Sequence, residues 1–260
     1  MNKTYFFMSG LPRSGNTLLS CILNQNPDLH VSPNSPVSYL TYQLNRVIRM
    51  REEYIGYPKP NFVGDMIVSV VDNYYKDIDK KYIIDRSGTW GVMDNLQIAK
   101  DFINPKPKVI CPVRNITDIL TSFISLCDKN PDNFIDKRIV SPSNENRCEF
   151  LMKKGSMIDV CLDSYLSALF PDFENCFLFL EYDDIVFNTS QTLKNIYEFL
   201  DLDFYNHDLK NISSYGGYND SIFGMPLHEV RSNIEKKSKN PKEVLGEKLF
   251  LKYSNLENWK

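Results

Sequence analysis

The most informative segment of this chain is SGLPRSGNT at residues 9–17. It follows the apolar run Thr4–Ser9, which is typical of a buried strand, and it leads into Thr17–Gln25, where leucine and isoleucine recur at helical spacing. A glycine-containing turn between a strand and a helix directs backbone N–H groups and the helix N-terminus at one spot. The stretch therefore predicts an anion-binding loop near the start of an α/β fold.

The loop has the glycine spacing of a nucleotide-phosphate loop but lacks its lysine. Gly10 and Gly15 are correctly spaced, and Thr17 stands where such loops carry their hydroxyl group. The lysine that should precede the hydroxyl residue is Asn16, and the nearest cation is Arg13. Because kinases and NTPases of this type use that lysine to reach the β- and γ-phosphates, a nucleoside triphosphate is a poor candidate ligand.

The rest of the chain alternates short apolar strands with longer amphipathic stretches. Three further strands are predicted, at Tyr82–Asp85, Lys108–Val113 and Cys176–Leu180, and each precedes a predicted helix, at Val92–Phe102, Asn115–Cys127 and Ser190–Leu200. This order predicts an α/β, P-loop NTPase-like three-layer fold, in which helices flank a central, mainly parallel sheet. The length suits a single domain over residues 1–260.

Other segments complete this outline. Ser35-Pro36 forms a good cap and first turn for a second helix, and Phe150–Phe170 is predicted to be one long helix. The polar stretch Asp128–Arg147 is predicted to be a surface excursion. Past Asn211 the chain is predicted to be irregular and then strongly basic.

The composition is that of an ordinary globular protein. Hydrophobic residues make up 42% and charged residues 24%, and the net charge of −3 gives no reason to expect nucleic acid as a partner. The six cysteines form no CxxC pair, which favours a reducing compartment. The sequence contains neither a signal-peptide pattern nor a membrane-spanning run, so we expect a soluble, cytoplasmic protein that does not contact a membrane.

A second candidate anion site begins at the end of the Lys108–Val113 strand. Arg114 follows that strand, and Ser122 lies about two helical turns beyond it. An arginine fork with one further donor is a sensible pair for a monophosphate. Taken alone, such a pair is more often a solvated helix face or a cap. Taken with the first loop, it predicts a second phosphate subsite.

These two segments resemble those of the sulfotransferase superfamily. The string at residues 10–19 is similar to its 5′-phosphosulfate loop, in the Pro-Arg-Ser-Gly form of the tyrosyl-protein and bacterial branches, and is closest to a group of bacterial and marine sulfotransferases. The cytosolic steroid and phenol branch has lysine in place of the arginine. Arg114 and Ser122 resemble the family's 3′-phosphate motif. The resemblance implies transfer of a sulfuryl group from 3′-phosphoadenosine 5′-phosphosulfate (PAPS) to a hydroxyl or amine, with release of 3′,5′-ADP.

Two weaker matches extend the implied binding site. Tyr182 resembles the tyrosine that lies against the adenine, although an ordinary half-buried aromatic residue is nearly as good a reading. The segment Gly224–Arg231 resembles the bacterial group's C-terminal segment and by its position could close over the nucleotide. The residues predicted to bind PAPS are Gly10, Pro12, Arg13, Ser14, Gly15, Asn16, Thr17, Arg114, Ser122, Tyr182 and Arg231.

The reaction needs a cation at the sulfuryl group and a base for the acceptor's proton. We predict Arg13 as the cation, assisted by Arg86 if its strand neighbours the first, with a solvated Arg86 as the alternative. The candidate bases are His228 and Asp85, which lies at the carboxyl end of a strand, where ligands of α/β proteins bind. The resemblance favours Asp85, because the bacterial group has an aspartate there too. Asp85 could instead be a helix cap or a partner of Arg86. Counting from the loop as in the tyrosyl-protein branch reaches Asn34, which cannot act as a base.

No metal site is predicted, because the three histidines lie far apart and none has metal-ligand spacing. The partner is expected to be a small-molecule, carbohydrate or peptide acceptor. Two alternatives remain open. One is a P-loop kinase or NTPase, in which Thr17 and Asp85 would hold Mg²⁺, and the other is a nucleotide-binding module without turnover.

Overall fold

The structure, a computed structural model, describes residues 3–214, 218–230, 232–235 and 239–256. Its core is a parallel sheet of five strands in the order β2-β3-β1-β4-β5. The strands are β1 (Thr4–Met8), β2 (Leu29–Val31), β3 (Tyr82–Arg86), β4 (Val109–Val113) and β5 (Phe177–Glu181). Because all pairs are parallel, the carboxyl ends of the strands meet at one edge, where ligands of such sheets bind.

Helices and helical turns connect the strands. They are α1 (Asn16–Leu23), α2 (Val37–Met50), α3 (Glu52–Gly56), α4 (Phe62–Tyr74), α5 (Met93–Ile98), the π-helical turn η1 (Ala99–Ile103), α6 (Ile116–Cys127), η2 (Asp136–Arg138), α7 (Asn144–Met152), α8 (Met157–Ser167), η3 (Pro171–Cys176), α9 (Tyr182–Phe187), α10 (Thr189–Leu200), η4 (Asp220–Phe223) and α11 (Pro241–Tyr253). No helix among the described residues is long and apolar enough to cross a membrane.

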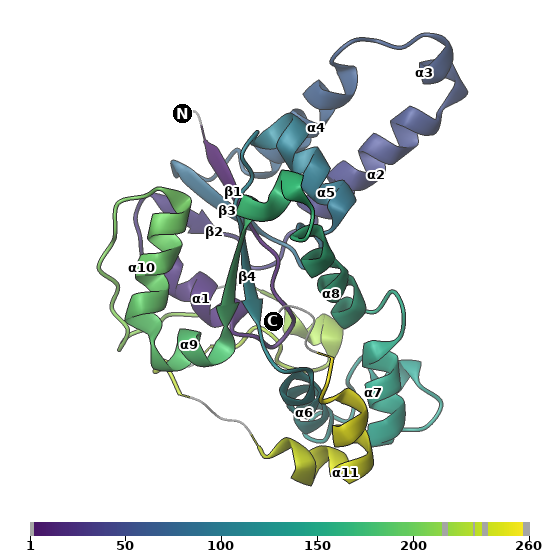
Figure 1. Ribbon diagram of the computed structural model, residues 1–260, viewed down its shortest axis with the longest axis vertical. Helices are drawn as coiled ribbons and strands as arrows, with labels where there is room; N and C mark the ends of the chain where they lie inside the picture. The colour runs from purple at the N-terminus through teal and green to yellow at the C-terminus, as the bar shows by residue number, and fades with distance from the viewer. Residues whose placement is uncertain (1–2, 215–217, 231, 236–238, 257–260) are drawn as a thin grey trace.

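The sheet separates two hydrophobic cores. Successive side chains of β1 point to opposite faces, so Phe6 and Met8 pack with α1, α9 and α10, whereas Tyr5 and Phe7 pack with α5, α6 and α8. Figure 1 shows α1 and α10 on one side of the strands and α8 on the other. The predicted three-layer fold with a mainly parallel sheet is confirmed.

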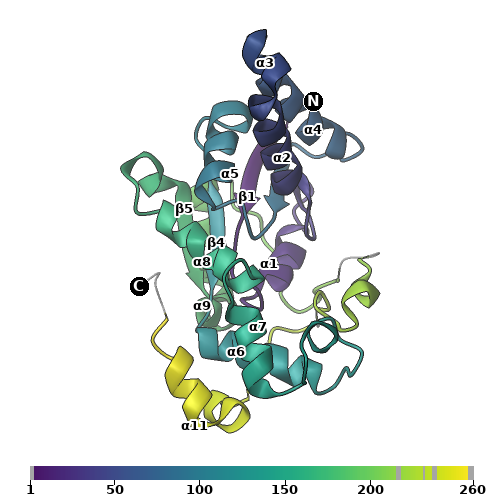
Figure 2. The same ribbon diagram turned by 90° about the vertical axis from the view of Figure 1, so that its right-hand side faces the viewer.

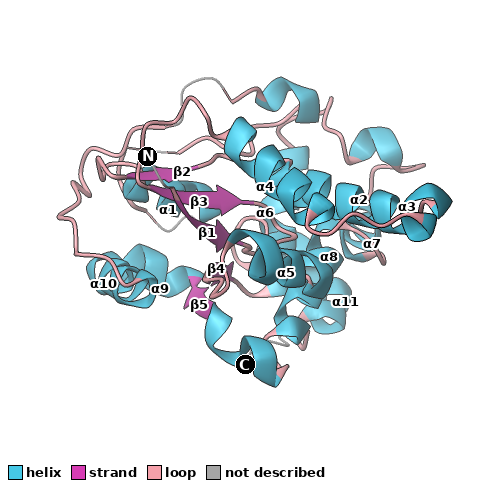
Figure 3. Cartoon of the chain, turned by 90° about the horizontal axis from the view of Figure 1, so that it is seen from above, coloured by secondary structure: helices cyan, strands magenta, loops and turns pink. Residues whose placement is uncertain are grey.

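Two peripheral parts extend this frame. Helices α2, α3 and α4 form an arm that projects from the body (Figure 1). At the opposite end α11 packs against α6, and Figure 2 shows it below α6 and α7. Seen from above in Figure 3, the strands lie between the group of α1, α9 and α10 and the group of α5, α6 and α8.

The predicted long helix Phe150–Phe170 is wrong, because the chain breaks between α7 and α8. Gly155 has a positive φ of 75°, and Ser156 starts α8 by accepting a hydrogen bond from the N–H of Asp159 at 3.3 Å. A left-handed residue followed by a capping serine ends one helix and begins another. The apolar spacing on both sides of the break resembled a single helix.

The Asp128–Arg147 excursion is only partly a surface loop. Phe134 is 8% exposed and Ile135 is fully buried, and both belong to the core beneath α6. Arg147 is also buried, and it pairs with Asp128 and Asp136. The loop is therefore anchored to the core through its middle, and Arg147 joins its two ends.

Candidate active site

The phosphate loop turns from β1 into α1 in a tightly packed conformation. The N–H of Leu11 donates to the carbonyl of Pro112 at 2.9 Å, so the loop is tied to the end of β4. A Cβ on Gly10 would lie 2.1 Å from Oδ1 of Asn16, which leaves room only for glycine. Arg13 and Gly15 both have positive φ, 61° and 88°. This curl exposes backbone N–H groups at the start of α1, where they favour an anion.

Asn16 shows what replaces the lysine of an NTPase loop. Its side chain is 9% exposed, and its Nδ2 donates to the carbonyl of Leu11 at 2.6 Å. The amide therefore ties the loop together from within. A side chain in this position supplies no charge to a phosphate.

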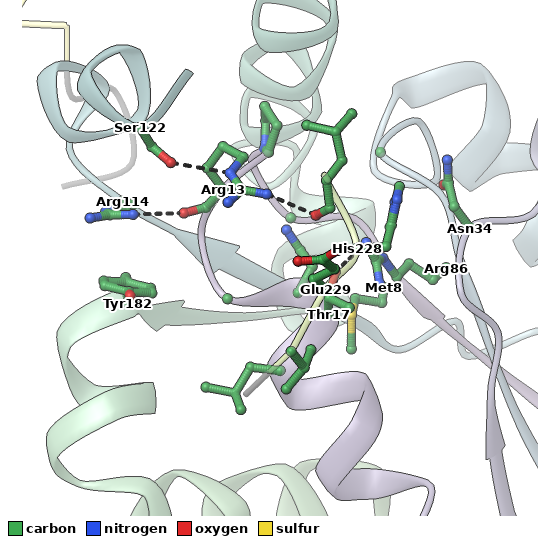
Figure 4. A pocket seen from close by; sticks show the side chains of 18 of the residues that line it. Met8, Arg13, Thr17, Asn34, Arg86, Arg114, Ser122, Tyr182, His228 and Glu229 are labelled. Atoms are coloured by element: carbon green, nitrogen blue, oxygen red, sulfur yellow. Dashed lines mark hydrogen bonds between the residues drawn. The ribbon is translucent and has the colours of Figure 1, made fainter. Parts of the chain in front are cut away.

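The Arg13 side chain links the loop to two distant segments, as Figure 4 shows. Its Nε donates to Oγ of Ser122 on α6 at 3.2 Å, and its Nη1 donates to the carbonyl of Leu227 at 2.8 Å. Burial, followed by the neighbouring charge of Arg114, lowers the pKa of Arg13 from its ordinary value. In the part of the chain that the structure describes, no carboxylate accepts a hydrogen bond from this guanidinium, and a guanidinium of this kind is a strong binding group for an anion.

Arg114 forms a second cationic group beside the loop. It is 8% exposed, and its Nη1 donates to the carbonyl of Arg13 at 3.0 Å. Its guanidinium carbon lies 4.0 Å from the ring centroid of Tyr182 at the start of α9. Its Nε is buried and has no hydrogen-bond partner among the described residues. A buried donor without a partner is costly, so this position favours a ligand that accepts from it.

Arg86 meets the loop because β3 is the neighbour of β1. The two strands pair in register, with Met8 opposite Arg86. Nη2 of Arg86 donates to Oγ1 of Thr17 at 3.1 Å. A cation built into the chain thus lies beside the hydroxyl that coordinates Mg²⁺ in NTPase loops.

His228 is held by a carboxylate that the sequence interpretation missed. Asp220 accepts from the backbone N–H of His228 at 2.8 Å and contacts its Nδ1 at 2.6 Å. Burial lowers the pKa of His228 below its ordinary value, Asp220 opposes that change, and the charges of Arg86 and Arg13 add to it. Asp220 precedes His228 by eight residues in an irregular segment, so no periodic pattern could have revealed the pair.

The phosphate loop, its neighbouring arginines and His228 line one cavity of about 460 Å³ at the carboxyl edge of the sheet. Of the predicted site residues it brings together Gly10, Pro12, Arg13, Gly15, Asn16, Thr17, Arg86, Arg114, Ser122, Tyr182 and His228. Asn34 and Glu229 also line it, although neither was predicted as a site residue. Ser14 is fully buried and is not part of the lining. The predicted binding residue Arg231 lies outside the described residues.

Asp85, the preferred candidate base, does not line the cavity. It is 1% exposed, and its carboxylate accepts hydrogen bonds from Ser35, Tyr75 and Trp90. Burial raises its pKa, and those three donors act in the opposite direction. An enclosed carboxylate with its lone pairs occupied cannot reach an acceptor in the cavity. It also cannot share a Mg²⁺ ion with Thr17, which weakens the kinase alternative. Asp85 instead fixes Ser35 and the start of α2.

Solved structures with the same fold are sulfotransferases. A mouse sulfotransferase complexed with PAP has a TM-score of 0.57 at 16% identity, covering 99% of this chain and 88% of that one. The sulfotransferase domain of the Synechococcus PCC 7002 olefin synthase has a TM-score of 0.53 at 18% identity, over 94% and 86% of the two chains. The sulfotransferase from Alicyclobacillus acidocaldarius has a TM-score of 0.55 at 14% identity, over 80% and 85%. At these identities the likeness concerns the fold. No curated protein matches the sequence significantly.

The family is shown by the sequence itself. The model of the sulfotransferase domain matches residues 3–221, which include β1 to β5, the phosphate loop and the Arg114–Ser122 pair. The chain therefore belongs to the sulfotransferase domain family and is an enzyme that transfers a sulfuryl group to an acceptor.

Proposed function

We propose that the donor is PAPS, bound with its 5′-phosphosulfate at the phosphate loop and its 3′-phosphate at Arg114 and Ser122. The observation that carries this proposal is the Nε of Arg114, which is buried and has no hydrogen-bond partner among the residues that the structure describes. Nη1 of the same side chain donates to the carbonyl of Arg13 in the phosphate loop, which already favours an anion. Two separate anion subsites in one cavity suit a nucleotide that is phosphorylated at both ends. A triphosphate would need only one extended subsite and the missing lysine.

Arg13 and Arg86 have the charges suited to the reacting group. Arg13 lies between the two subsites through its contact with Ser122, and Arg86 lies at the loop hydroxyl Thr17. Cations fixed before the reaction stabilise charge on the sulfuryl and bridging oxygens without solvent reorganisation. We assign Arg13 to the sulfuryl group and Arg86 to its bridging side.

His228 is the proposed general base, in place of Asp85. Its Nδ1 is engaged by Asp220, so Nε2 is the nitrogen left to take a proton from the acceptor. Asp220 fixes the ring and would stabilise the imidazolium that forms, as an orienting carboxylate does in other enzymes. Figure 4 shows His228 beside Thr17 and Arg86, where the sulfuryl group would lie in this proposal.

The finer assignments follow the sequence resemblance. The Pro-Arg-Ser-Gly string supports membership of the bacterial branch, and the acceptor is a hydroxyl or amine of a small molecule, carbohydrate or peptide. We further propose that residues 1–260 form a single domain and that the enzyme works in the cytoplasm.

The first test separates this proposal from the kinase alternative. At 100 times its Kd, 3′,5′-ADP without Mg²⁺ should stabilise the protein by about 2.7 kcal/mol. For a chain of this size that corresponds to a rise in Tm of roughly 5–10 °C. Mg·ATP at the same concentration should have little effect, because Asn16 stands in place of the lysine. A larger shift with Mg·ATP than with 3′,5′-ADP would favour the kinase.

The second test concerns the 3′-phosphate. The double variant Arg114→Ala, Ser122→Ala should lose much of its affinity for 3′,5′-ADP, because each charged hydrogen bond contributes roughly 1.5–3 kcal/mol, or about 10–150-fold. Affinity for 5′-AMP, which lacks that phosphate, should hardly change. Isothermal calorimetry with both nucleotides measures the difference and also detects damage to the loop, which would weaken both.

Ser125→Ala is the matched control on the same helix. Its Oγ is buried without a hydrogen-bond partner among the described residues, and Ser125 does not line the cavity. The control should bind both nucleotides as the wild type does. If the double variant kept the wild-type preference for 3′,5′-ADP over AMP, the 3′ assignment would be wrong.

A further inference from the structure

The segment that carries His228 is short, irregular and closed on itself. It starts at η4, passes through Gly224 and ends at His228, whose ring and backbone both contact Asp220. Its Leu227 carbonyl accepts the hydrogen bond from Arg13. Neither a strand nor a long helix holds this segment, so its position depends on what it packs against.

It packs against the 128–138 part of the anchored excursion. The N–H of Phe134 donates to the carbonyl of Phe223 at 2.8 Å, and their rings meet edge to face at 5.8 Å. Gly224 has a φ of 64°, and a Cβ there would lie 2.2 Å from the carbonyl oxygen of Asp132. The two backbones thus touch at a point where a side chain cannot be accommodated. Figure 2 shows the loop before α7 beside the segment that carries η4.

The excursion is itself rigidly held. Arg147 on α7 pairs through Nε and Nη2 with both oxygens of Asp136, at 2.8 and 2.7 Å, and through Nη1 with Asp128 at 2.7 Å. Asn133, fully buried, accepts from the N–H groups of Ile135 and Asp136 and donates to the carbonyl of Asn130. This internal bonding gives the loop a fixed surface toward Phe223 and Gly224.

We propose that the loop of residues 128–138 is a buttress that sets the position of His228 in the cavity, with Gly224 as the positioning residue at the contact. None of Arg147, Asn133, Phe134 and Gly224 lines the cavity, and each acts on the reaction through the 220–228 segment. The inference rests on the proposed role of His228 as the base. It assigns a role in the reaction to a loop that the sequence interpretation treated as a surface excursion.

The test uses two glycines that share a backbone conformation and differ in their surroundings. Gly224→Ala places a methyl group against the backbone of Asp132, whereas Gly155→Ala, at a φ of 75°, places one in open space. Both variants carry the cost of a left-handed alanine, so their difference isolates the contact. We expect kcat of Gly224→Ala to fall about 10–100-fold relative to Gly155→Ala, since a shift of about 1 Å in a catalytic group can cost that much.

Two further readouts distinguish positioning from general damage. Among the described residues, the charged groups that act on the pKa of the imidazole are Asp220 in its own segment, Arg86 at the end of β3 and Arg13 in the loop, and burial has the largest effect on that pKa. Moving the segment outward weakens the influences that lower this pKa, so the acid limb of kcat/KM should move to higher pH in Gly224→Ala alone. Affinity for 3′,5′-ADP should stay within about threefold in both variants, because Arg114 and the phosphate loop are unchanged.

If the two alanine variants had the same kcat and the same pH profile, the buttress would be refuted. Equal losses of kcat and of 3′,5′-ADP affinity would also refute it, because they would mean a general disturbance. Hydrogen exchange supplies a readout that does not depend on the base: the amide of Phe134 should exchange faster in Gly224→Ala than in Gly155→Ala. The amide of Phe134 could exchange faster in Gly224→Ala while the separate variant His228→Gln stays fully active. That pair of results would support the contact between the loop and the segment and would refute the assignment of His228 as the base.

Discussion

Replacing Arg13 by alanine should lower kcat by about 10²–10³-fold, the range for loss of one preorganised donor from a developing charge. Among the described residues, the guanidinium donates to the hydroxyl of Ser122 and to the carbonyl of Leu227, and no carboxylate accepts from it. Its positive charge can therefore stabilise the negative charge that develops on the sulfuryl group during transfer. Because the effect arises in the transition state, KM for PAPS should change much less than kcat, and steady-state kinetics separate the two.

Arg13→Lys is the control for charge. Lysine and alanine meet the same left-handed backbone at a φ of 61°, so both variants carry the same conformational cost. The lysine keeps a positive charge and loses the planar fork. We expect it to retain most of the rate. A variant Arg13→Ala with unchanged kcat and a raised KM would place Arg13 in ordinary substrate binding.

Replacing His228 by glutamine should lower kcat by about 10²–10⁴-fold, the usual contribution of a positioned base. Glutamine keeps a polar side chain of similar size and cannot accept the acceptor's proton at neutral pH. Burial lowers the pKa of His228 from 6.5, so the neutral, basic imidazole persists below that pH. The kcat/KM of the wild type should therefore rise with pH through a midpoint below 6.5 and then level off.

Asp220→Asn tests the same assignment by the direction in which the acid limb of kcat/KM moves. Asp220 raises the pKa of His228 against the effect of burial, so its removal should move the acid limb to still lower pH while kcat falls. This shift is opposite to the one expected for Gly224→Ala. A His228→Gln enzyme with normal turnover and an unchanged acid limb would show that another group takes the proton.

The sequence predicted the parts of the site that depend on local structure. The strand, loop and first helix are within one or two residues of β1 and α1, because glycine spacing and helical periodicity act over short distances. The pair of Arg114 and Ser122 follows from the same strand–helix logic. The role of Arg86 could be predicted only on the condition that β3 lies beside β1, because the order of strands in a sheet cannot be inferred from any one segment.

The sequence predictions fail for residues whose surroundings are set by tertiary contacts. Asp85 ends a strand, as a catalytic carboxylate often does, yet the folding of Tyr75 and Trp90 over it takes it out of reach. Asp220 was missed because its pairing with His228 depends on η4 and on the left-handed Gly224. The second strand, Leu29–Val31, is too short to show an alternating pattern. Helix α11 was not predicted, and Gly246 interrupts its helical geometry.

The guanidinium of Arg86 beside Thr17 has a consequence for how the site is supplied with charge. A metal ion must be obtained from solution, competes with other ions and is lost to any stronger chelator. A guanidinium is made at translation, reaches its place when β3 pairs with β1, and stays charged at every physiological pH. Depletion of divalent ions in a cell would therefore leave the positive charge of Arg86 unaltered.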